Sequence, residues 1–546
     1  MRARSLLKND PPPPPLGPEL EPRSDRRLAI GLFVFLALVY GIAMFTHGLI
    51  PAEEPRFAEV VREMIARGSW WVPFKNGLPY VEYPPLYYWL SIIARLAGLP
   101  LRAAIRVPGT IAFLLWIFWM GRWVKSAFPN VSPTLPRLAL AALPIALYNF
   151  FTAHTDSLLA LGVLMAYTGY LRHRQGSGTR FPWELWSGLA IATTAKGPVG
   201  LAITLPAMGL DLIASTSGFR FFSKAGWRAL WQGIRSLRPI RGLILSLGVL
   251  ALWAVMAGFQ ANWDFDRAFF IYQNFTRFLS GLDHEHGPFL YLKSLWGDFF
   301  PWAFLLPFGI ILAWRRRHEP AFRLSLLWVL WTIIFFSVSV SKQSKYILPA
   351  APAIVTLSLA ALGWVFGRRA HRISWVGYGI SAFLLAAAGF VALFVLPGWV
   401  FPGLIPTPGT MRGLPVLRSY LLRHPAPFVS YLYPAPPTIY ALYPLRQAPI
   451  PYVRSARALY AEVRSGQINA GSYLIVYRNT LPVPGRKPTS VTLSPAPSPA
   501  YFTRVLSIPA QGGLILYRVR RQARTMPRPD TPTPPPWHWW DQFDTD

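Results

Sequence analysis

The chain of 546 residues contains no cysteine, and only 14% of its residues are charged, against roughly 25% in an average soluble protein. Disulfide bonds, thiolate catalysis and cysteine-ligated metal sites are therefore excluded. Acidic residues are scarce, with 23 Asp and Glu against 54 Lys and Arg. The polar, proline-rich N-terminal segment lacks the shape of a cleavable signal peptide, so the first apolar run is expected to act as both signal and anchor.

Long apolar blocks fill most of the first 400 residues, and each approaches the ~20 residues that cross a bilayer as a helix. This pattern predicts an α-helical polytopic membrane protein with about 11 transmembrane helices. The predicted spans lie near 28–49, 106–121, 135–151, 155–171, 184–195, 197–214, 240–258, 288–313, 321–340, 346–366 and 375–397.

The net charge of +31 does not indicate nucleic-acid binding, because the basic residues lie mainly in short loops between apolar blocks. One set of alternate loops, which includes the N-terminus, holds about 25 Lys and Arg, and the other set holds about 12. The positive-inside rule then predicts a protein of the cell membrane with a cytoplasmic N-terminus. The same rule predicts that everything after about residue 400 lies outside the cytoplasm.

After residue 400 the apolar blocks stop and short strand-like and helix-like patterns alternate, which predicts a small extracytoplasmic α/β domain. The tail lacks a pattern that could pack and is predicted to be disordered. The predicted organisation comprises a disordered cytoplasmic N-terminus 1–27, a transmembrane domain 28–400 with a large external loop 50–105, an α/β domain 401–522 and a disordered tail 523–546.

Polar residues of an unusual kind gather on the predicted outer side of the membrane. They are Glu53, Glu54, Arg56, Tyr80, Glu82, Tyr83, Asp156, Lys196, Asn274, Arg277, His284, His286, Lys342 and Lys345. Carboxylates and cations at a membrane surface suit a reaction on an anionic, lipid-linked substrate. A carboxylate there accepts a proton from an attacking hydroxyl, and Arg or Lys holds a phosphate that gains charge as it leaves.

Each of these residues also has a plainer interpretation. Charged residues just outside a span are commonly solvated loop residues. Asp156 is placed to cap the fourth span, and Lys196 to extend its ammonium group to the interface. His284 and His286 flank a glutamate like metal ligands, but their spacing is not helical. What the plainer interpretations do not explain is the gathering of all these residues on one side.

Several motifs, in order, resemble one membrane family. The segment "AEEPRFAEVVREMIARGSWWVPFKNGLPYVEYPPLYYWL" resembles the first external loop of bacterial glycosyltransferases related to aminoarabinose transferase and protein O-mannosyltransferases. The pieces "TDSLLALGVLMA", "TAKGPVG", "QNFTRFL", "HGPFLYLKSLWGDFFPW" and "SKQSKYILPAAPA" resemble later elements of that family. The resemblance covers about 50–400, and the external C-terminal domain resembles the aminoarabinose-transferase branch.

The resemblance implies a GT-C fold and an inverting transfer of a sugar from a polyprenyl-phosphate carrier to an acceptor hydroxyl or phosphate on a lipid, glycan or protein. It implies catalytic roles for Glu53 and Asp156. The substrate or phosphate contacts it implies are Glu54, Arg56, Tyr80, Glu82, Tyr83, Lys196, Asn274, Arg277, Lys342 and Lys345. This scheme does not specify a cofactor. A divalent cation held by Glu82, His284 and His286 is a separate hypothesis.

Three residues depart from the family pattern. Glu53 replaces an aspartate, Phe57 replaces a tyrosine, and Tyr83 stands where the aminoarabinose enzymes have a lysine, which weakens the expectation of an aminoarabinose donor. The alternatives are a lipid-linked sugar flippase or a non-catalytic envelope-assembly scaffold. Transporters commonly carry ionisable residues at mid-membrane within repeated halves, whereas the spans here are nearly free of acids.

Overall fold

The computed structural model describes residues 22–50, 53–177, 180–216, 224–261, 263–276, 278, 286–366, 369–395, 414–431, 450–453, 456–477, 502–508 and 514–520. They form two compact units, each described by itself below. The helical unit draws on Met1–His47, Glu82–Ser280 and His286–Phe394, and the second unit on Gly48–Val81, Gly281–Glu285 and Val395–Asp546.

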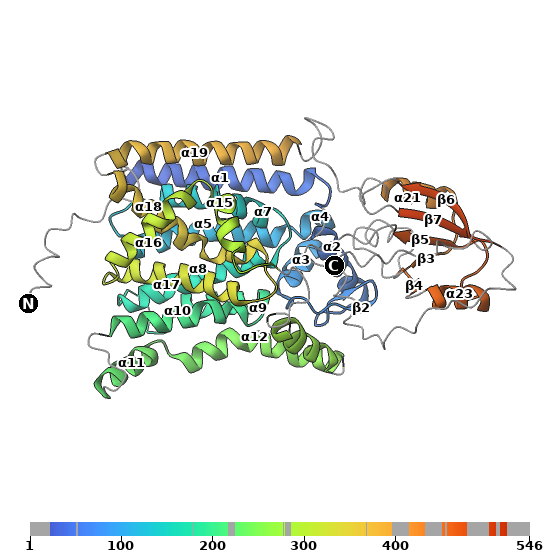
Figure 1. The fold of residues 1–546 in the computed structure, drawn as a ribbon, viewed down its shortest axis with the longest axis horizontal. Coiled ribbons are helices and arrows are strands. Elements are labelled where there is room, and N and C mark those ends of the chain that lie inside the picture. Colours follow the sequence, from blue (N-terminus) through green and yellow to red (C-terminus); the bar gives the residue numbers. More distant parts are fainter. Residues whose placement is uncertain are drawn as a thin grey trace, which may run out of the picture. The chain divides into compact units, whose positions relative to one another are not determined.

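The helical unit is built almost entirely of α-helices (Figure 1). The longer ones are α1 (Pro22–Thr46), α5 (Val107–Ala127), α8 (Thr155–Arg174), α9 (Trp183–Lys196), α10 (Val199–Ser215), α12 (Pro239–Gln260), α17 (Pro320–Val338), α18 (Ala351–Phe366) and α19 (Ala370–Phe390). The shorter ones are α3 (Leu86–Leu96), α4 (Leu101–Ala104), α6 (Thr134–Ala141), α7 (Pro144–Phe151), α11 (Lys224–Ser236), α13 (Asp264–Arg267), α15 (Leu290–Asp298) and α16 (Leu306–Arg315). Two 3-10 helices, Trp302–Leu305 and Ser344–Ala350, and two π-helices, Ala268–Thr276 and Val391–Val395, complete the unit.

Every predicted span overlaps one or more of these helices, but fewer are long and apolar enough to cross a bilayer alone. Among the described residues six qualify, at Arg23–Thr46, Leu101–Ala127, Pro239–Gln260, Pro320–Val338, Ser344–Phe366 and Arg372–Val395. A seventh is added if α6 and α7, which meet at a bend of 67°, form one span. A multi-pass membrane protein is therefore confirmed, and the total of about eleven spans stays a prediction.

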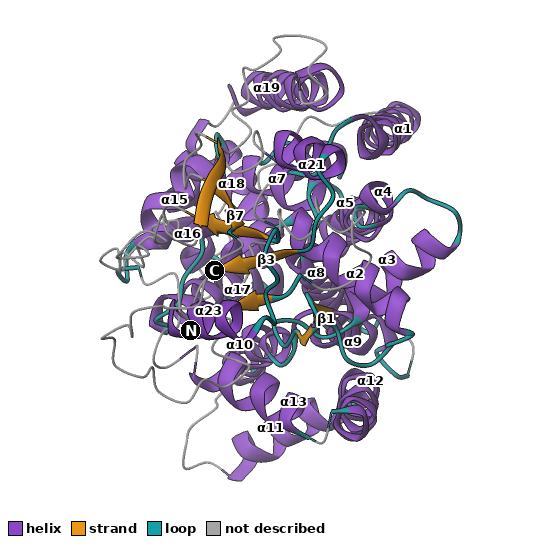
Figure 2. Ribbon diagram, turned by 90° about the vertical axis from the view of Figure 1, so that its right-hand side faces the viewer, coloured by secondary structure: helices purple, strands orange, loops and turns teal. Residues whose placement is uncertain are grey.

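The central helix of this unit is α8, which packs against α5, α9 and α10 (Figure 2). Every residue from Thr155 to Leu171 is buried by protein. A helix enclosed in this way does not need the uniformly apolar surface of a lipid-facing span. Its sequence accordingly mixes Thr, Ser, Gly and Tyr with Leu and Ala, a composition that lowers its hydropathy without exposing polar groups to lipid.

Glycine allows α8 and α9 to lie in backbone contact. A Cβ atom added at Gly162 on α8 would lie 2.4 Å from the carbonyl oxygen of Gly188 on α9. The reverse substitution at Gly188 would place a Cβ atom 2.5 Å from the carbonyl oxygen of Gly162. Small residues at helix interfaces have this role in membranes, where packing rather than hydrophobic burial drives helix association.

The second unit contains the first part of the external loop and a five-stranded sheet. The loop part forms α2 (Glu54–Arg67) and the short hairpin β1 (Phe74–Lys75) and β2 (Leu78–Pro79). The sheet has the order β4-β3-β5-β7-β6, with β3 parallel to β4 and β5, and β7 antiparallel to β5 and β6. Its strands are β3 (Phe428–Tyr431), β4 (Tyr452–Val453), β5 (Tyr473–Tyr477), β6 (Phe502–Ile508) and β7 (Leu514–Val519).

One helix covers each face of this sheet. Leu417 and Leu421 of α21 (Leu414–Arg423) join a core with Ile475, and Leu459 of α23 (Ala456–Ser465) joins a separate core with Leu474. Adjacent residues of β5 thus point to opposite faces, as the two-residue period of a strand requires.

The hairpin of the loop is joined to the C-terminal segment by one buried asparagine. The Asn76 side-chain amide donates to the Ile450 carbonyl oxygen at 3.1 Å and accepts from the Ile450 N–H at 2.8 Å. Asn76 itself has φ +49°, a left-handed conformation that asparagine tolerates better than most residues.

Two predicted boundaries differ from the structure. The helix of the first span begins at Pro22, inside the predicted N-terminal segment 1–27. Proline at the start of a helix and an acid, Asp25, in its first turn both favour a helix that begins there. The first external loop was assigned to the transmembrane domain, but its part Gly48–Val81 groups with the C-terminal segment. The two hydrogen bonds between Asn76 and Ile450 connect these parts, and no local pattern in the sequence indicates them.

We expect Gly162→Ala to lower the free energy of unfolding by about 1–3 kcal/mol, because its methyl group would force α8 and α9 apart. The thermal unfolding midpoint of purified protein in lipid nanodiscs measures this. Gly248→Ala in α12 is the matched control, since an added Cβ there meets nothing within 4 Å. An unchanged midpoint for Gly162→Ala would contradict the close contact.

Candidate active site

The N-terminal end of α8 and the C-terminal end of α9 meet in an ion pair. Asp156, in the first turn of α8, accepts a hydrogen bond from the Lys196 ammonium group at the last residue of α9. Asp156 is 1% exposed, and the Lys196 side chain is 14% exposed. The dipole of each helix favours the charge at its own end, an anion at an N-terminus and a cation at a C-terminus.

Further groups surround this pair within the helical unit. The Lys345 Nζ lies 3.5 Å from Nδ1 of His154, the residue that precedes α8. The Lys196 Nζ also lies 4.6 Å from the centre of the Tyr346 ring, a cation–π contact. Lys345 and His154 lie within electrostatic range of the Asp156 carboxylate. We call Asp156, Lys196, Lys345, His154 and Tyr346 the acid–lysine cluster.

The tight turn after Lys196 is shaped by a glycine. Gly197 has φ +79°, and a Cβ atom added there would lie 3.3 Å from the Phe269 ring and 3.4 Å from Oδ1 of Asn274. Asn274 belongs to the π-helix Ala268–Thr276, and its side-chain amide donates to the Phe269 carbonyl oxygen at 2.7 Å. π-Helices are rare and are frequent at functional sites. Asn274 therefore lies beside the turn that follows Lys196.

Lys342 lies in the loop before the 3-10 helix Ser344–Ala350 and is buried. Its ammonium group donates to the carbonyl oxygens of Ser339 and, at 3.2 Å, His286. Removal from water lowers the pKa of Lys342. These carbonyl contacts hold the loop, so Lys342 has a structural role in addition to any contact with an anion.

In the second unit, the "AEEPRF" motif forms the start of α2, with Pro55 in its first turn. The Glu53 carboxylate accepts a hydrogen bond from the Arg56 guanidinium, and both side chains are partly exposed, at 16% and 12%. Glu54 is fully buried and accepts from the Ile50 N–H at 2.7 Å. Of the two adjacent glutamates, Glu53 is thus the one with surface open to a substrate, and Glu54 holds the loop.

The acidic residues further along α2 also stabilise the fold of this loop. Glu59 is fully buried and accepts from Nε of Arg62 at 2.8 Å, and its burial raises its pKa to about 7. Glu63 accepts from the Gly77 N–H of the hairpin at 2.9 Å. The acid-rich motif therefore divides into one partly exposed carboxylate and three buried ones that fix the fold of the loop.

The other predicted site residues are described only in part. Tyr80 is fully buried, with the Lys75 ammonium group 5.0 Å from the centre of its ring. Glu82 and Tyr83 are half-buried in the segment before α3. Arg277 and His284 lie outside the described residues. No group of three or more His, Asp or Glu that could hold a metal ion is found in the described part of the chain, and the predicted cation ligands include the undescribed His284.

The structure adds His154 and Tyr346, which the sequence did not single out. Their positions in the sequence could have pointed to both, because His154 lies two residues before Asp156 and Tyr346 follows Lys345 directly. The alternative roles of Asp156 and Lys196 are also decided. His154, not Asp156, is the N-cap residue of α8, and the Lys196 ammonium group binds Asp156 rather than simply reaching the interface.

Comparison with known proteins shows what the chain is similar to. The chain is 28% identical over 354 residues to an undecaprenyl phosphate-α-4-amino-4-deoxy-L-arabinose arabinosyl transferase of Serratia proteamaculans, a match covering 61% of the chain and 58% of that relative. It is 26% identical over 391 residues to the protein of the same name from Pectobacterium carotovorum, covering 68% and 66%. The chain thus spans less than two thirds of the length of these relatives. No family model matches it.

The fold has a close counterpart among solved structures. ArnT from Cupriavidus metallidurans bound to undecaprenyl phosphate superimposes with a TM-score of 0.69 at 20% identity, over 90% of this chain and 98% of that one. The arabinofuranosyltransferase AftD from Mycobacteria gives a TM-score of 0.51 at 15% identity, over 93% and 40%. The chain has a GT-C fold. The resemblance found in its motifs is confirmed, since the relatives and this solved structure carry the names of aminoarabinose transferases.

We expect Lys196→Met to lower the free energy of unfolding by about 3 kcal/mol, because it would leave the buried Asp156 carboxylate without its ion-pair partner. The double variant Asp156→Asn/Lys196→Met should recover part of that loss. Thermal unfolding in nanodiscs measures both, with the exposed Lys293→Gln on α15 as the control. Equal midpoints for Lys196→Met and the wild type would show that the pair contributes nothing to stability.

Proposed function

We propose that the protein is an inverting glycosyltransferase that moves a sugar from a polyprenyl-phosphate carrier to an acceptor hydroxyl or phosphate of a lipid, glycan or protein. The observation that carries the proposal is the acid–lysine cluster. It places a buried carboxylate beside two lysines at one end of the helical unit, in a chain whose fold matches that of a protein solved with undecaprenyl phosphate bound.

In the reaction, the acceptor oxygen attacks the anomeric carbon of the sugar from the face opposite the phosphate. A new C1–O bond forms, the C1–O bond to the phosphate breaks, and the electron pair of that bond leaves with the polyprenyl phosphate. The acceptor proton passes to a carboxylate. The leaving phosphate is an anion of low basicity, so it needs cations rather than a strong general acid.

Lys196 and Lys345 are the proposed phosphate contacts, because the Lys196 ammonium group is hydrogen-bonded to Asp156 and that of Lys345 lies within electrostatic range of it. A phosphate that draws Lys196 away from Asp156 would leave the carboxylate without its ion-pair partner. Asp156 would then be more basic at the moment when an acceptor proton has to be taken up. This exchange couples binding of the donor to activation of the base.

The remaining roles follow from the family resemblance. Glu53 is proposed as a catalytic carboxylate and Arg56 as its partner and a phosphate contact, in keeping with their partial exposure. Proposed substrate contacts are Glu54, Tyr80, Glu82, Tyr83, Asn274, Arg277 and Lys342. For Glu54 and Lys342 the contribution is indirect, since both hold loops through backbone hydrogen bonds.

We further propose a cell-membrane location with the eleven-span topology, a cytoplasmic N-terminus and an extracytoplasmic segment after residue 400. The excess of Lys and Arg in one set of alternate loops supports this orientation. The acid–lysine cluster then lies on the outer side, where a sugar carried by a polyprenyl phosphate would be used.

The test supplies purified full-length protein in nanodiscs with a panel of labelled polyprenyl-phosphate sugars and crude envelope acceptors. We expect one donor to release free polyprenyl phosphate. Asp156→Asn and Glu53→Gln should each reduce the rate by about 10²–10⁴-fold, the usual contribution of a general base.

Lys293→Gln serves as the activity control, and thermal midpoints verify that each variant is folded. Retained activity in both acid variants would remove them from the mechanism. Tight binding of a lipid-linked sugar without release from any donor would instead favour a flippase or a scaffold.

A further inference from the structure

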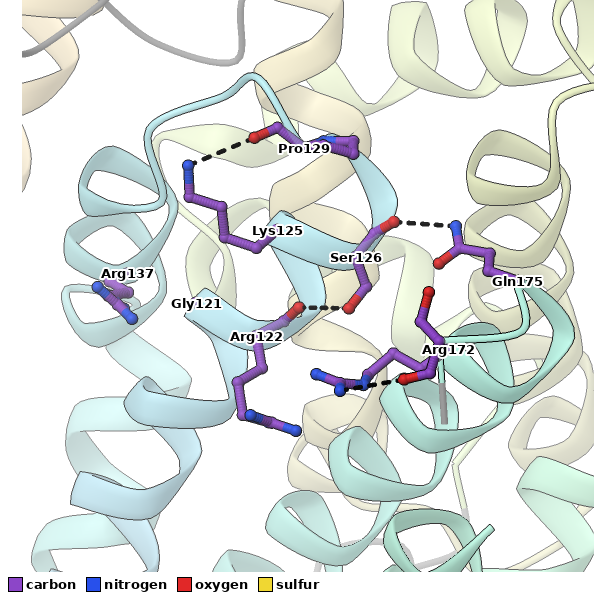
Figure 3. A pocket seen from close by; sticks show the side chains of 9 residues that line it. Gly121, Arg122, Lys125, Ser126, Pro129, Arg137, Arg172 and Gln175 are labelled. Atoms are coloured by element: carbon purple, nitrogen blue, oxygen red, sulfur yellow. Dashed lines mark hydrogen bonds between the residues drawn. The ribbon is translucent and has the colours of Figure 1, made fainter. Parts of the chain in front are cut away.

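A basic pocket lies at the end of α8 opposite the acid–lysine cluster. Its cavity has a volume of about 630 Å³ and is lined by Gly121, Arg122, Lys125, Ser126, Pro129, Arg137, Arg172, Gln175 and Ser177, most of which Figure 3 labels. Asp156 and Arg172 are 16 residues apart on one helix, which corresponds to about 24 Å at a rise of 1.5 Å per residue. The pocket is therefore a separate site from the candidate active site.

Positive charge dominates the lining. It contains four cations, Arg122, Lys125, Arg137 and Arg172. Of these, Arg122 and Arg172 share the single carboxylate of Glu184, at 2.9 Å and 3.5 Å, and Asp25 lies within electrostatic range of Arg137. Four cations thus face two carboxylates, which leaves an excess of positive charge among the described residues. The lining contains no aromatic ring on which a nucleobase could stack. These features suit a compact anion such as a phosphate group.

The Arg137 guanidinium occupies space that is left open because residue 121 is a glycine. A Cβ atom added at Gly121 would lie 1.9 Å from Nη2 of Arg137, so the guanidinium lies directly against the α5 backbone. The Arg137 Nε is buried and has no hydrogen-bond partner among the described residues. A cation fixed in this way, with a donor left over, is arranged for a ligand rather than for the interior of the protein.

Lys125 and Gln175 define the open side of the pocket. The Lys125 Nζ is 3.4 Å from the Pro129 carbonyl oxygen, and Gln175 donates to the Ser126 carbonyl oxygen at 3.0 Å (Figure 3). Lys125 is exposed, so its ammonium group can turn from this long contact to an incoming anion.

A strip of exposed apolar side chains on α5 leads into this pocket. Ile111, Leu115 and Phe118 are 51%, 39% and 42% exposed. They are followed on the same helix face by Arg122 and Lys125, because the spacings are four, three, four and three residues. An acyl chain lying along the strip would bring its headgroup to the two cations. A soluble phosphate compound has no apolar chain that could contact the strip.

We propose that this pocket binds the phosphate headgroup of an anionic phospholipid, with an acyl chain along Ile111, Leu115 and Phe118. Under the proposed orientation the lipid belongs to the inner leaflet. Basic pockets between transmembrane helices on that side are suited to acidic headgroups. The proposal does not depend on the glycosyltransferase reaction, so either can fail without the other.

The test counts lipids bound to the detergent-purified full-length protein by native mass spectrometry. Dioctanoyl phosphatidylglycerol, dioctanoyl phosphatidylcholine and glycerol 3-phosphate are titrated separately. We expect one tightly bound phosphatidylglycerol, with binding at least tenfold weaker for phosphatidylcholine and for glycerol 3-phosphate. Lys125→Gln/Arg137→Gln and Gly121→Ala should each weaken phosphatidylglycerol binding at least tenfold.

Arg174→Gln is the matched control, because Arg174 lies at the same end of α8 but does not line the pocket. Unchanged phosphatidylglycerol binding in both pocket variants would overturn the site. If glycerol 3-phosphate binds as tightly as the lipid, the acyl chain contributes nothing to binding. The pocket would then be assigned to a soluble phosphate compound. If Arg174→Gln weakens phosphatidylglycerol binding as much as the pocket variants do, the binding depends on surface charge in general and not on this pocket.

Discussion

The helical unit depends on one constraint: α8 is surrounded by protein, yet it carries a carboxylate in its first turn. A buried charge is tolerated only when a partner neutralises it. Lys196 supplies that charge from the end of α9, and the two helices can bring the groups together because they touch through Gly162 and Gly188. The polar pair and the glycine contacts are therefore parts of one arrangement. Helix packing positions the charges, and the charges fix the ends of the packed helices.

The two ends of α8 have different electrostatic character. At one end a carboxylate lies among lysines and a histidine, where a substrate phosphate and an acceptor proton can both be handled. At the other end arginines and a lysine surround an open cavity, and their charge is only partly offset by Glu184 and Asp25. The same enclosed helix thus carries a mixed-charge site and a cationic site about 24 Å apart, which suits chemistry at one membrane surface and lipid attachment at the other.

Sequence patterns predicted the positions of the helices well, because apolar runs report directly on burial in lipid or protein. The sequence also placed Asp156, Lys196 and Asn274 on one side of the membrane among many other polar residues, and the structure brings these three close to one another at the end of α9. Two features were not predicted from the sequence. The division of the glutamates of α2 into one partly exposed and three buried residues depends on backbone partners such as Ile50 and Gly77, which no helix pattern specifies. The basic pocket depends on a glycine that makes room for Arg137, and glycine in an apolar run gives no sign of such a neighbour.

The asparagine that joins the first loop to the C-terminal segment also has a consequence for biosynthesis. Asn76 and Ile450 are 374 positions apart in the chain. At a synthesis rate of about 5–20 residues per second, Asn76 leaves the ribosome about 20–75 seconds before its partner exists. During that interval the loop must wait with its amide bonded to water or to some other protein group. The loop that follows the first apolar helix is thus among the earliest parts of the chain to be made and among the last to be completed.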